Sequence, residues 1–522
     1  KKSAKSFVSN SALSSGTWYK IGITSDGIYK LDYNFLSNLG IDVSTVDPTH
    51  INVYGNGVGV LPESNSGYRP DDLLLNAVSF VGNEADGSFD ASDYILFWGN
   101  GPHRIQQNGP ELEHIWNVYT DTSFYFIRVD GSVSPKRITN QAQSAGVTTH
   151  TVTSFNDYAY KEEDKLNFHE SGKEWYGDTY NSVNSDHVYT FNFPNITTDS
   201  VKMLTKLASR SSTTNDFTIT APGSVTDVVG LGSVAGSSYE YAKLGSSTMY
   251  FDNAPSSISV TIDYDLNLSN TAEGWLDEIR INARRNLIMS GTNMAFQDIE
   301  STGSGNVASF TLSGASAVTE IWEVTDQTNV TSVDFTDGGS VKTFNMDADS
   351  LRKYVAITSS AGTTPVAFGP VANQNLHALP YADLILISPS SLLSEANELA
   401  SFHVNNGTSV HVVTPWQIYN EFSSGMRDIA AIRQFLIMFY ERAGSDPTLI
   451  PKHLLLFGDG SYDNKGLVST LENPIPTYQS EAHVSKTSTF TSDDYFTILA
   501  PSAGFSSADL LDMSVGRLPI TS

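Results

Sequence analysis

Residues 452–463 decide how the C-terminal part of this chain folds, and they read Lys452-His453-Leu454-Leu455-Leu456-Phe457-Gly458-Asp459-Gly460-Ser461-Tyr462-Asp463. A short apolar run that stops at Gly-Asp-Gly is typical of a strand buried on both faces of a parallel sheet. In open α/β sheets, the residues just beyond such strands line the ligand crevice. The pattern therefore predicts that Asp459 lies at a crevice. The alternative is a tight turn in which its carboxylate binds nearby backbone N–H groups.

The residues before this stretch alternate between strand and helix patterns. Short apolar runs predict strands at 383–387 and 409–413. Between them, apolar residues recur on one helical face from Leu392 to His403, and a second apolar stripe begins after Asp428 and ends at Gly444. The order β-α-β-α-β predicts a mostly parallel sheet with right-handed crossovers and helices on both faces.

Polar residues after this strand, and before a later one at 514–519, are the candidate site residues. We predict that Asp459, Ser461, Asp493 and Asp494 line the crevice. The carboxylates of Asp459, Asp463, Asp493 and Asp494 are also candidate ligands for calcium, which prefers oxygen donors. Hydrogen bonding to the neighbouring loops is the favoured alternative, because a single sequence does not show that the four side chains converge.

The rest of the chain has the pattern of β structure. Residues 1–150 alternate apolar and polar positions with short Asp, Gly and Asn turns, which predicts a small β-rich domain with one helix at Asp32 to Gly40. Residues 151–372 continue in the same way and predict one or more β-sandwich-like domains. Residues 373–522 form the α/β region. The predicted strands of the middle part are His187 to Phe193, Val201 to Leu207, Ser257 to Tyr264 and Tyr354 to Thr358.

Two blocks in the middle part place a tryptophan beside carboxylates. They are residues 171–178, around Trp175, and residues 274–280, around Trp275. Such pairs occur in sugar and amine sites, but more often the indole is buried and the charges solvate its rim. We therefore favour a structural role for both blocks.

Composition limits the function. A chain of 522 residues is long enough for three or four domains. Its net charge of −27 opposes binding to nucleic acid and direct attraction to anionic lipid. There is no cysteine, so these residues contain no disulfide, thiolate metal site or cysteine nucleophile. No apolar run is long enough to span a bilayer.

Blocks along nearly the whole chain resemble the PorU family, the gingipain-like sortases (peptidase family C25) of the type IX secretion system. Each block alone is weakly specific, but their common order makes the resemblance strong. The blocks are Trp18–Lys20, Gly27–Leu31, Ser171–Gly177, Gly274–Asp277, Ala283–Arg285, Trp322–Thr325, Asn373–His377, Gln417–Gly425, Asp428 with Ala431–Arg433, Leu455–Tyr462, Ser492–Phe496 and Val515–Pro519.

This resemblance implies a gingipain-like α/β domain, similar to caspases, in which a His-Gly turn and a Cys at the next strand end form the catalytic dyad. Both elements follow the Gly-Arg-Leu-Pro strand in the family. Here that strand lies three residues before Ser522. We therefore expect the dyad beyond Ser522, no catalytic residue in this piece, and no activity from it alone. The histidines of the α/β region are expected to have packing or surface roles, and they are His377, His403, His411, His453 and His483.

The resemblance also implies a function for the whole protein. It is that of a cysteine endopeptidase and transpeptidase that removes the C-terminal signal domain of secreted cargo and attaches the cargo to lipopolysaccharide. The implied location is the outer face of the outer membrane, after export with a signal peptide that is removed. The implied partners are the outer-membrane β-barrel PorV, other components of the attachment complex, and the cargo proteins. No nucleic acid partner and no cofactor are expected, apart from the calcium considered above.

Two other function classes remain open from the residues. A relative without cysteine would use the same fold to bind rather than cut, as a scaffold of the attachment complex. A nucleotide-binding α/β protein would use Gly458-Asp459-Gly460 at the strand end. The loop lacks the spacing and the lysine of a phosphate-binding Gly-x-x-x-x-Gly-Lys motif, so this alternative ranks last.

Overall fold

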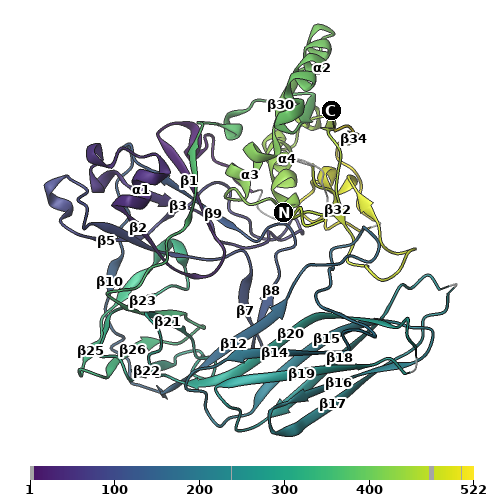
Figure 1. Cartoon of the computed structure of the whole chain (residues 1–522). Helices are drawn as coiled ribbons and strands as arrows, with labels where there is room; N and C mark the ends of the chain where they lie inside the picture. Colours follow the sequence, from purple (N-terminus) through teal and green to yellow (C-terminus); the bar gives the residue numbers. More distant parts are fainter. Residues whose placement is uncertain (1–4, 237, 268, 469–474, 507, 522) are drawn as a thin grey trace.

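The computed structural model describes residues 5–236, 238–267, 269–468, 475–506 and 508–521. A front β region, a long β sandwich and a smaller pair of sheets precede a C-terminal α/β region, which carries most of the helix (Figure 1). The fold class predicted from the sequence, β-rich domains followed by an α/β region with a parallel sheet, is confirmed.

The front region is built on two antiparallel sheets that share an apolar core. Side chains from both sheets, among them Ile21, Leu31, Phe97 and Tyr125, pack together with the buried side of one helix. The first sheet has the order β28 (Val366–Val371), β1 (Trp18–Ile23), β9 (Ser123–Arg128), β3 (Asn52–Tyr54) and β4 (Leu75–Asn76). The second has the order β2 (Gly27–Asp32), β6 (Tyr94–Gly99) and β5 (Val78–Val81).

The helix of the front region is α1 (Tyr33–Leu39), as predicted. Asp32 caps its N-terminus by accepting from the backbone N–H of Phe35 at 2.9 Å. Gly40 ends it in the left-handed conformation, with φ 104°, where an L side chain would be strained. Local capping chemistry therefore sets both ends of this element.

The sandwich is formed by two sheets that face each other across a core of large apolar side chains. Alternate residues of its strands point inward, as the burial of β19 shows position by position. One sheet has the order β12 (Ser154–Glu162), β20 (Glu273–Asn286), β15 (Val201–Arg210) and β18 (Lys243–Phe251), with β13 (Thr179–Tyr180) beside β20. The other has the order β14 (Asp186–Asn192), β19 (Ser257–Asp265), β16 (Asn215–Ala221) and β17 (Val225–Leu231).

A third β unit lies between the sandwich and the front region. Its two sheets each take one strand from residues before 153, paired in parallel with a strand from after residue 306. One sheet has the order β10 (Thr139–Gln141), β24 (Thr331–Val333), β23 (Val318–Glu323), β27 (Tyr354–Thr358) and β21 (Asn293–Phe296). The other has the order β11 (His150–Val152), β22 (Val307–Leu312), β26 (Lys342–Asp347) and β25 (Thr336–Asp337).

Sheets cross the positions proposed as domain boundaries. β28 lies in the second predicted segment but pairs with β1 of the first. β10 lies at the end of the first segment and β11 crosses the boundary at residue 150, and both complete sheets of the third unit. The boundaries at residues 150 and 372 stay predictions, because hydropathy patterns do not show which distant strands pair.

The α/β region has one sheet of four parallel strands with helices on both faces. Ile385 and Ile387 pack against α3 and α4, whereas Leu386 lies among side chains of α2. This alternation explains why the strands are continuous apolar runs. The sheet has the order β30 (Val410–Val413), β29 (Leu384–Ile387), β31 (His453–Phe457) and β34 (Ser514–Leu518); the helices are α2 (Leu393–Asn405), α3 (Pro415–Phe422) and α4 (Ile429–Ala443).

The sequence analysis predicted α2 and α4 but not α3. Thr414 caps α3 in a capping box with Gln417, and Pro415 occupies its first position. These start signals were present in the sequence, but the helix is short. Among the described residues, no helix is both long and apolar enough to cross a bilayer.

Candidate functional site

A crevice opens at the carboxyl edge of the parallel sheet, directly beyond β31. It has a volume of about 300 Å³. Asp459 and Ser461 line it from the loop after β31, and Arg517 lines it from the last strand. A small two-stranded sheet of β32 (Tyr478–Gln479) and β33 (Thr491–Ser492) lies beside it, and β33 contributes lining residues. Asp459 thus lies directly after β31, among the residues that line this crevice.

Arg517 forms the floor of the crevice with Asp493. Its guanidinium donates to both carboxylate oxygens of Asp493, at 2.8 and 2.6 Å, in the bidentate geometry of a strong ion pair. It also donates to the backbone oxygens of Gly458, Ile475 and Pro476. Arg517 is thus held by five hydrogen bonds and ties the loop after β31 to the last strand of the sheet.

The predicted site residues do not all reach the crevice. Asp459, Ser461 and Asp493 line it, whereas Asp494 is exposed and is not among the lining residues. Asp459 accepts the backbone N–H of Gly460 at 2.8 Å. The function of these residues stays a prediction. The sequence analysis did not select Arg517 as a site residue, although it lies in one of the quoted blocks.

The four candidate calcium ligands are spread over separate interactions. Asp463 is buried and accepts the backbone N–H groups of Gly466 and Val468, at 2.8 and 2.7 Å. Asp493 pairs with Arg517, as described above. Within the described ranges, no three of the candidate aspartates bring oxygens within 4.8 Å of one another. The hydrogen bonds agree with the loop-bonding alternative, and calcium stays a prediction.

A loop of the sandwich forms one wall of the crevice. Glu170 is among the lining residues and has a φ of 54°, which is unusual for a residue other than glycine. Trp175 stacks on Tyr462, with ring centroids 5.7 Å apart and planes at 14°. Nothing in the sequence pointed to this contact, because the two segments are separated by almost 300 residues.

Lys173 anchors the same loop to the α/β region. Its amine pairs with Glu63 of the front region at 2.6 Å and with Glu481 at 2.5 Å. The backbone N–H groups of Gly172 and Lys173 donate to Gln479 and Ser480. Three regions of the chain therefore meet beside the crevice.

Trp175 and Trp275 are both buried, with 7% and 2% of their surface exposed. Trp275 packs with Phe168 and Tyr241 inside the sandwich. The burial of both indoles agrees with the favoured structural role, but the expected solvated rim is not found, because Glu278 is also buried, at 3% exposed, and Glu174 and Asp277 are not exposed.

His377 belongs to a buried network and not to the crevice. Its Nδ1 lies 2.6 Å from Glu421 of α3, and its Nε2 lies 3.2 Å from Asp71 of the front region. Burial by itself would lower the pKa of His377, but the hydrogen bonds with Asp71 and Glu421 outweigh it and raise the pKa to about 9. Glu421 also accepts the backbone N–H of Leu376 at 2.8 Å. The network joins the α/β region to the front region, in agreement with the packing role expected for His377.

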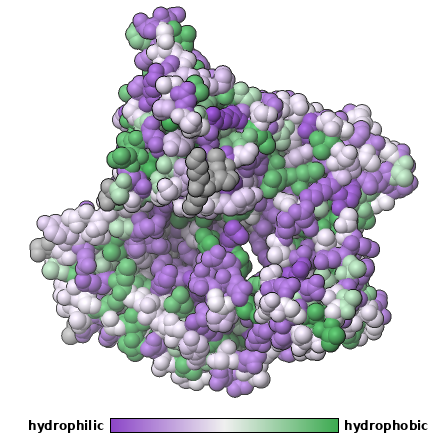
Figure 2. Space-filling view, turned by 180° about the vertical axis from the view of Figure 1, so that it is seen from behind, coloured by the Kyte–Doolittle hydropathy of each residue, from purple (hydrophilic) through white to green (hydrophobic). Residues whose placement is uncertain are grey.

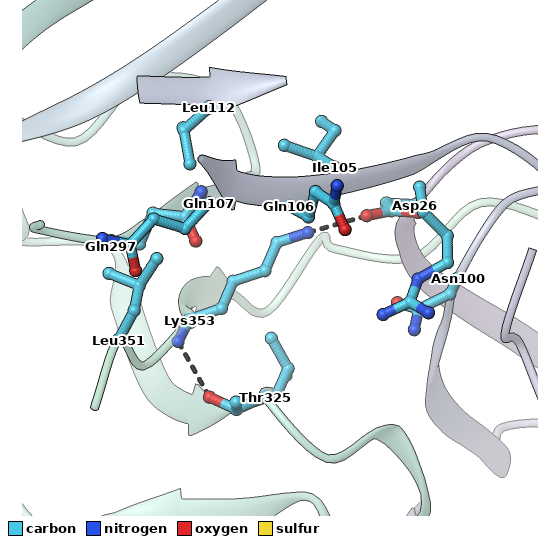
Figure 3. A pocket seen from close by; sticks show the side chains of 12 residues that line it. Asp26, Asn100, Ile105, Gln106, Gln107, Leu112, Gln297, Thr325, Leu351 and Lys353 are labelled. Carbon is cyan, nitrogen blue, oxygen red and sulfur yellow. Dashed lines mark hydrogen bonds and ion pairs between the residues drawn. The ribbon is translucent and has the colours of Figure 1, made fainter. Parts of the chain in front are cut away.

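A second cavity, of about 210 Å³, lies between the front region and the third β unit (Figure 3). The side chain of Lys353 runs across it to Asp26, at 2.7 Å, and its backbone N–H donates to Thr325 (Figure 3). Gln106 and Gln297 contribute amide groups to the lining. Seen from behind, the molecule also has an opening bordered largely by hydrophilic residues (Figure 2). The sequence analysis made no prediction about this cavity.

Comparison with known proteins assigns the α/β region to a class. Residues 377–522 match the model of peptidase family C25, which is a family of cysteine peptidases. This part of the chain, with its crevice at the sheet edge, is therefore similar to the peptidases of family C25. A search of curated protein sequences gives no match.

The whole chain has the fold of a particular solved structure. It superposes on dimeric latent PorU from Porphyromonas gingivalis with a TM-score of 0.84 and 23% sequence identity. The match covers 100% of this chain and 50% of that one, so the chain spans about half the length of the PorU it resembles. The resemblance to PorU-like C25 peptidases drawn from the sequence is confirmed.

Other solved structures match only loosely. The globular domain of zebrafish complement 1qA protein matches with a TM-score of 0.14 and 10% identity, over 26% of this chain and 95% of its own. The insecticidal delta-endotoxin Cry8Ea1 from Bacillus thuringiensis matches with a TM-score of 0.18 and 13% identity, over 47% of this chain and 43% of its own. Neither match bears on function.

Proposed function

We propose that the 522 residues are the front part of a sortase: a cysteine endopeptidase and transpeptidase that removes the C-terminal signal domain of secreted cargo. The observation that carries this proposal is the PorU fold along the whole chain together with the C25 match of residues 377–522. The described residues supply the crevice floor, and the nucleophile comes from outside them, because the 522 residues contain no cysteine.

The chemistry follows from a covalent intermediate. A cysteine thiolate attacks the scissile carbonyl, the leaving segment departs, and a thioester remains on the enzyme. Water and an amine then compete for the thioester, and the geometry of the site decides which of them reacts. Attack by water gives hydrolysis, whereas attack by an amine of lipopolysaccharide attaches the cargo to it. The crevice beyond Gly458 is the place where the cargo chain would lie.

The proposed location is the outer face of the outer membrane, with attachment through the partner PorV. The described residues contain no helix suited to spanning a membrane, and the net charge of −27 opposes direct docking to anionic lipid. A protein partner in the membrane would supply the attachment. Deleting PorV tests this part, because the protein is then expected in the medium instead of on the cell surface.

The experiment for the activity uses the intact protein. Replacing its nucleophilic cysteine by alanine is expected to leave cargo with the signal domain attached and without lipopolysaccharide, as read by mass spectrometry of the cargo. Normal cargo maturation in that variant would refute the enzymatic proposal.

A non-catalytic scaffold is the second candidate, because the absence of cysteine from the 522 residues is compatible with either function. A cysteine-directed activity probe separates the two. Labelling of the intact protein together with no labelling of the 522-residue piece supports the peptidase, whereas no labelling of either supports the scaffold.

A further inference from the structure

A buried group of one histidine and two glutamates lies where the β7 (Arg104–Asn108) and β8 (Glu111–Ile115) hairpin meets the sandwich. His114 comes from β8, Glu162 from β12 and Glu278 from β20. Their side chains are 1%, 10% and 4% exposed, and one ligand atom from each lies within 4.8 Å of the others. Three strands from two regions thus bring three metal-ligating side chains together.

The imidazole of His114 is oriented toward the two carboxylates. Its Nδ1 contacts the hydroxyl of Tyr158, and its ring stacks on Tyr160 with centroids 4.3 Å apart. Its Nε2 contacts Glu162 and lies 3.6 Å from Oε2 of Glu278. Histidines that bind metals are held in this manner, with one nitrogen fixed by a hydrogen bond and the other turned to the ion.

Two further contacts hold the hairpin on the sheet beside this group. The backbone N–H of Leu112 donates to the side-chain oxygen of Asn282 at 2.8 Å, and the amide of Asn282 donates back to the carbonyl of Leu112 at 3.0 Å. The backbone of β8 is therefore held against β20 two residues before His114, and this fixes the position from which the histidine reaches the group. A preorganised group of this kind loses little freedom when it binds an ion.

A β-bulge adds a further carboxylate to the same place. Lys206 pairs with Glu278 and Leu207 with Leu276, so Asp277 is an extra residue in β20. Bulges redirect side chains and are frequent beside functional sites. Asp277 is hydrogen-bonded to Glu174 and interacts electrostatically with both Glu278 and His114.

Two cations and several carboxyl groups surround the buried group. Lys206 at 2.9 Å and Arg280 at 3.0 Å are both nearest to Oε1 of Glu278. Arg280 also approaches Oε2, at 3.3 Å, on the side that faces the histidine. Glu174 and Asp277 are hydrogen-bonded to each other, which requires a proton shared between the two carboxyl groups. Glu162 and Glu278 are the carboxyl groups beside the imidazole, and a divalent cation held between them would offset the cost of burying their charge.

We propose that His114, Glu162 and Glu278 bind a divalent transition-metal ion, with Zn²⁺ the best match, and that the ion fastens the β7–β8 hairpin to the sandwich. An imidazole nitrogen with carboxylate oxygens suits zinc, whereas calcium prefers an all-oxygen shell. The role is structural and is independent of the proposed peptidase activity, because the three residues lie on the hairpin and the sandwich and not among those that line the crevice.

Calorimetric titration of the purified 522-residue chain with Zn²⁺ tests this proposal. One ion per chain is expected, and His114→Ala is expected to weaken binding at least about a hundredfold. Tyr158→Phe removes only the group that orients the ring and is expected to cost about tenfold. Zn²⁺ is also expected to raise the Tm of the wild-type chain and not that of His114→Ala, because an ion stabilises only the form that binds it.

His150→Ala is the matched control, since His150 lies on the third β unit and its ring is hydrogen-bonded only to the neighbouring Thr149. It is expected to bind zinc like wild type. Circular dichroism checks that each variant is folded, and His114→Gln replaces His114→Ala if the latter is not. X-ray absorption spectroscopy at the zinc edge identifies the ligand atoms in the wild-type protein. One imidazole nitrogen and oxygens from two carboxylates are expected. No binding by wild type, equal binding by the His114 variants, or an edge spectrum without the histidine nitrogen would each overturn the proposal.

Discussion

The α/β region is joined to the rest of the molecule by two junctions of different character. Its junction with the front region is built on buried groups: Arg433 of α4, which is fully buried, donates to the backbone oxygen of Glu63, and the buried imidazole of His377 lies 3.2 Å from Asp71. Its ion pair with the sandwich is peripheral, since Lys173 is 13% exposed and its α/β partner Glu481 is 79% exposed. Water screens charges at the second junction but not at the first. The buried junction is therefore expected to contribute most to stability, and the peripheral one to position the crevice wall.

His377→Ala is the substitution with the largest expected effect. Removing the imidazole leaves the carboxylate of Glu421 buried without its partner, which costs about 3–5 kcal/mol in the free energy of unfolding. Urea unfolding measures the loss. His403→Ala on α2 is the control and is expected to change stability by less than about 0.5 kcal/mol. Equal losses of unfolding free energy in the two variants would show that the buried junction with the front region does not contribute more to stability than the site of His403.

Arg433→Met tests the second buried charge of this junction. The guanidinium donates to the backbone oxygens of Ile498, Glu63 and Gly504 and lies 4.4 Å from the ring centroid of Tyr495. Methionine fills much of the volume but leaves these oxygens without a donor, so a loss of about 3 kcal/mol is expected. Arg442→Met, at an exposed position with one such bond, serves as the matched control in the same unfolding measurement.

The pH dependence of stability tests how much the buried His377 contributes to the junction with the front region. The pKa of His377 is about 9 in the folded protein against an ordinary value of 6.5. Its contribution is fully present below pH 6.5 and is lost as pH rises through 9, because the unfolded chain binds the proton less tightly. The change amounts to about 3 kcal/mol. Thermal unfolding of wild type and His377→Gln between pH 6 and pH 10 should converge at the alkaline end, and parallel curves would contradict this assignment.

Lys20, at the same junction, has the opposite effect on the pH dependence of stability. Burial lowers its pKa to about 7, and its amine donates to Asn420 and to the carbonyl of Gly425 beside the ring of Phe124. Because the unfolded chain keeps the proton up to its ordinary pKa of 10.5, this residue makes stability rise between pH 7 and pH 10.5. Lys20→Met should flatten that part of the stability profile, and an unchanged slope would argue against the lowered pKa.

Lys173→Ala has the smallest expected effect on stability, at most about 1 kcal/mol, because partly exposed ion pairs contribute little. Its expected consequence is local. The loop that carries Glu170 and Trp175 should become more mobile, which faster hydrogen exchange of the backbone amides at 169–176 would report. Unchanged exchange there would mean that the Trp175–Tyr462 contact and the backbone hydrogen bonds to Gln479 and Ser480 hold the wall without the ion pairs.

Helix α4 shows which features of a helix the local sequence predicts and which depend on tertiary packing. Its start at Asp428 and its end near Gly444 were predictable from capping residues, and its apolar stripe predicted one buried face. The structure buries every residue from Ile429 to Phe439, including Arg433 and Gln434. The front region covers the side that an isolated amphipathic helix would expose to water, as the bond from Arg433 to Glu63 shows.

The sequence by itself predicted the strands β29, β30 and β31, the helices α2 and α4, and a mostly parallel sheet in the α/β region, because periodicity and capping are local properties of the chain. Only the tertiary structure decided that Glu170 forms a crevice wall, that β28 completes the first sheet, and that His114 meets Glu162 and Glu278. These contacts join residues tens to hundreds of positions apart. They depend on which surfaces become complementary once the regions have folded, and no local pattern encodes that choice.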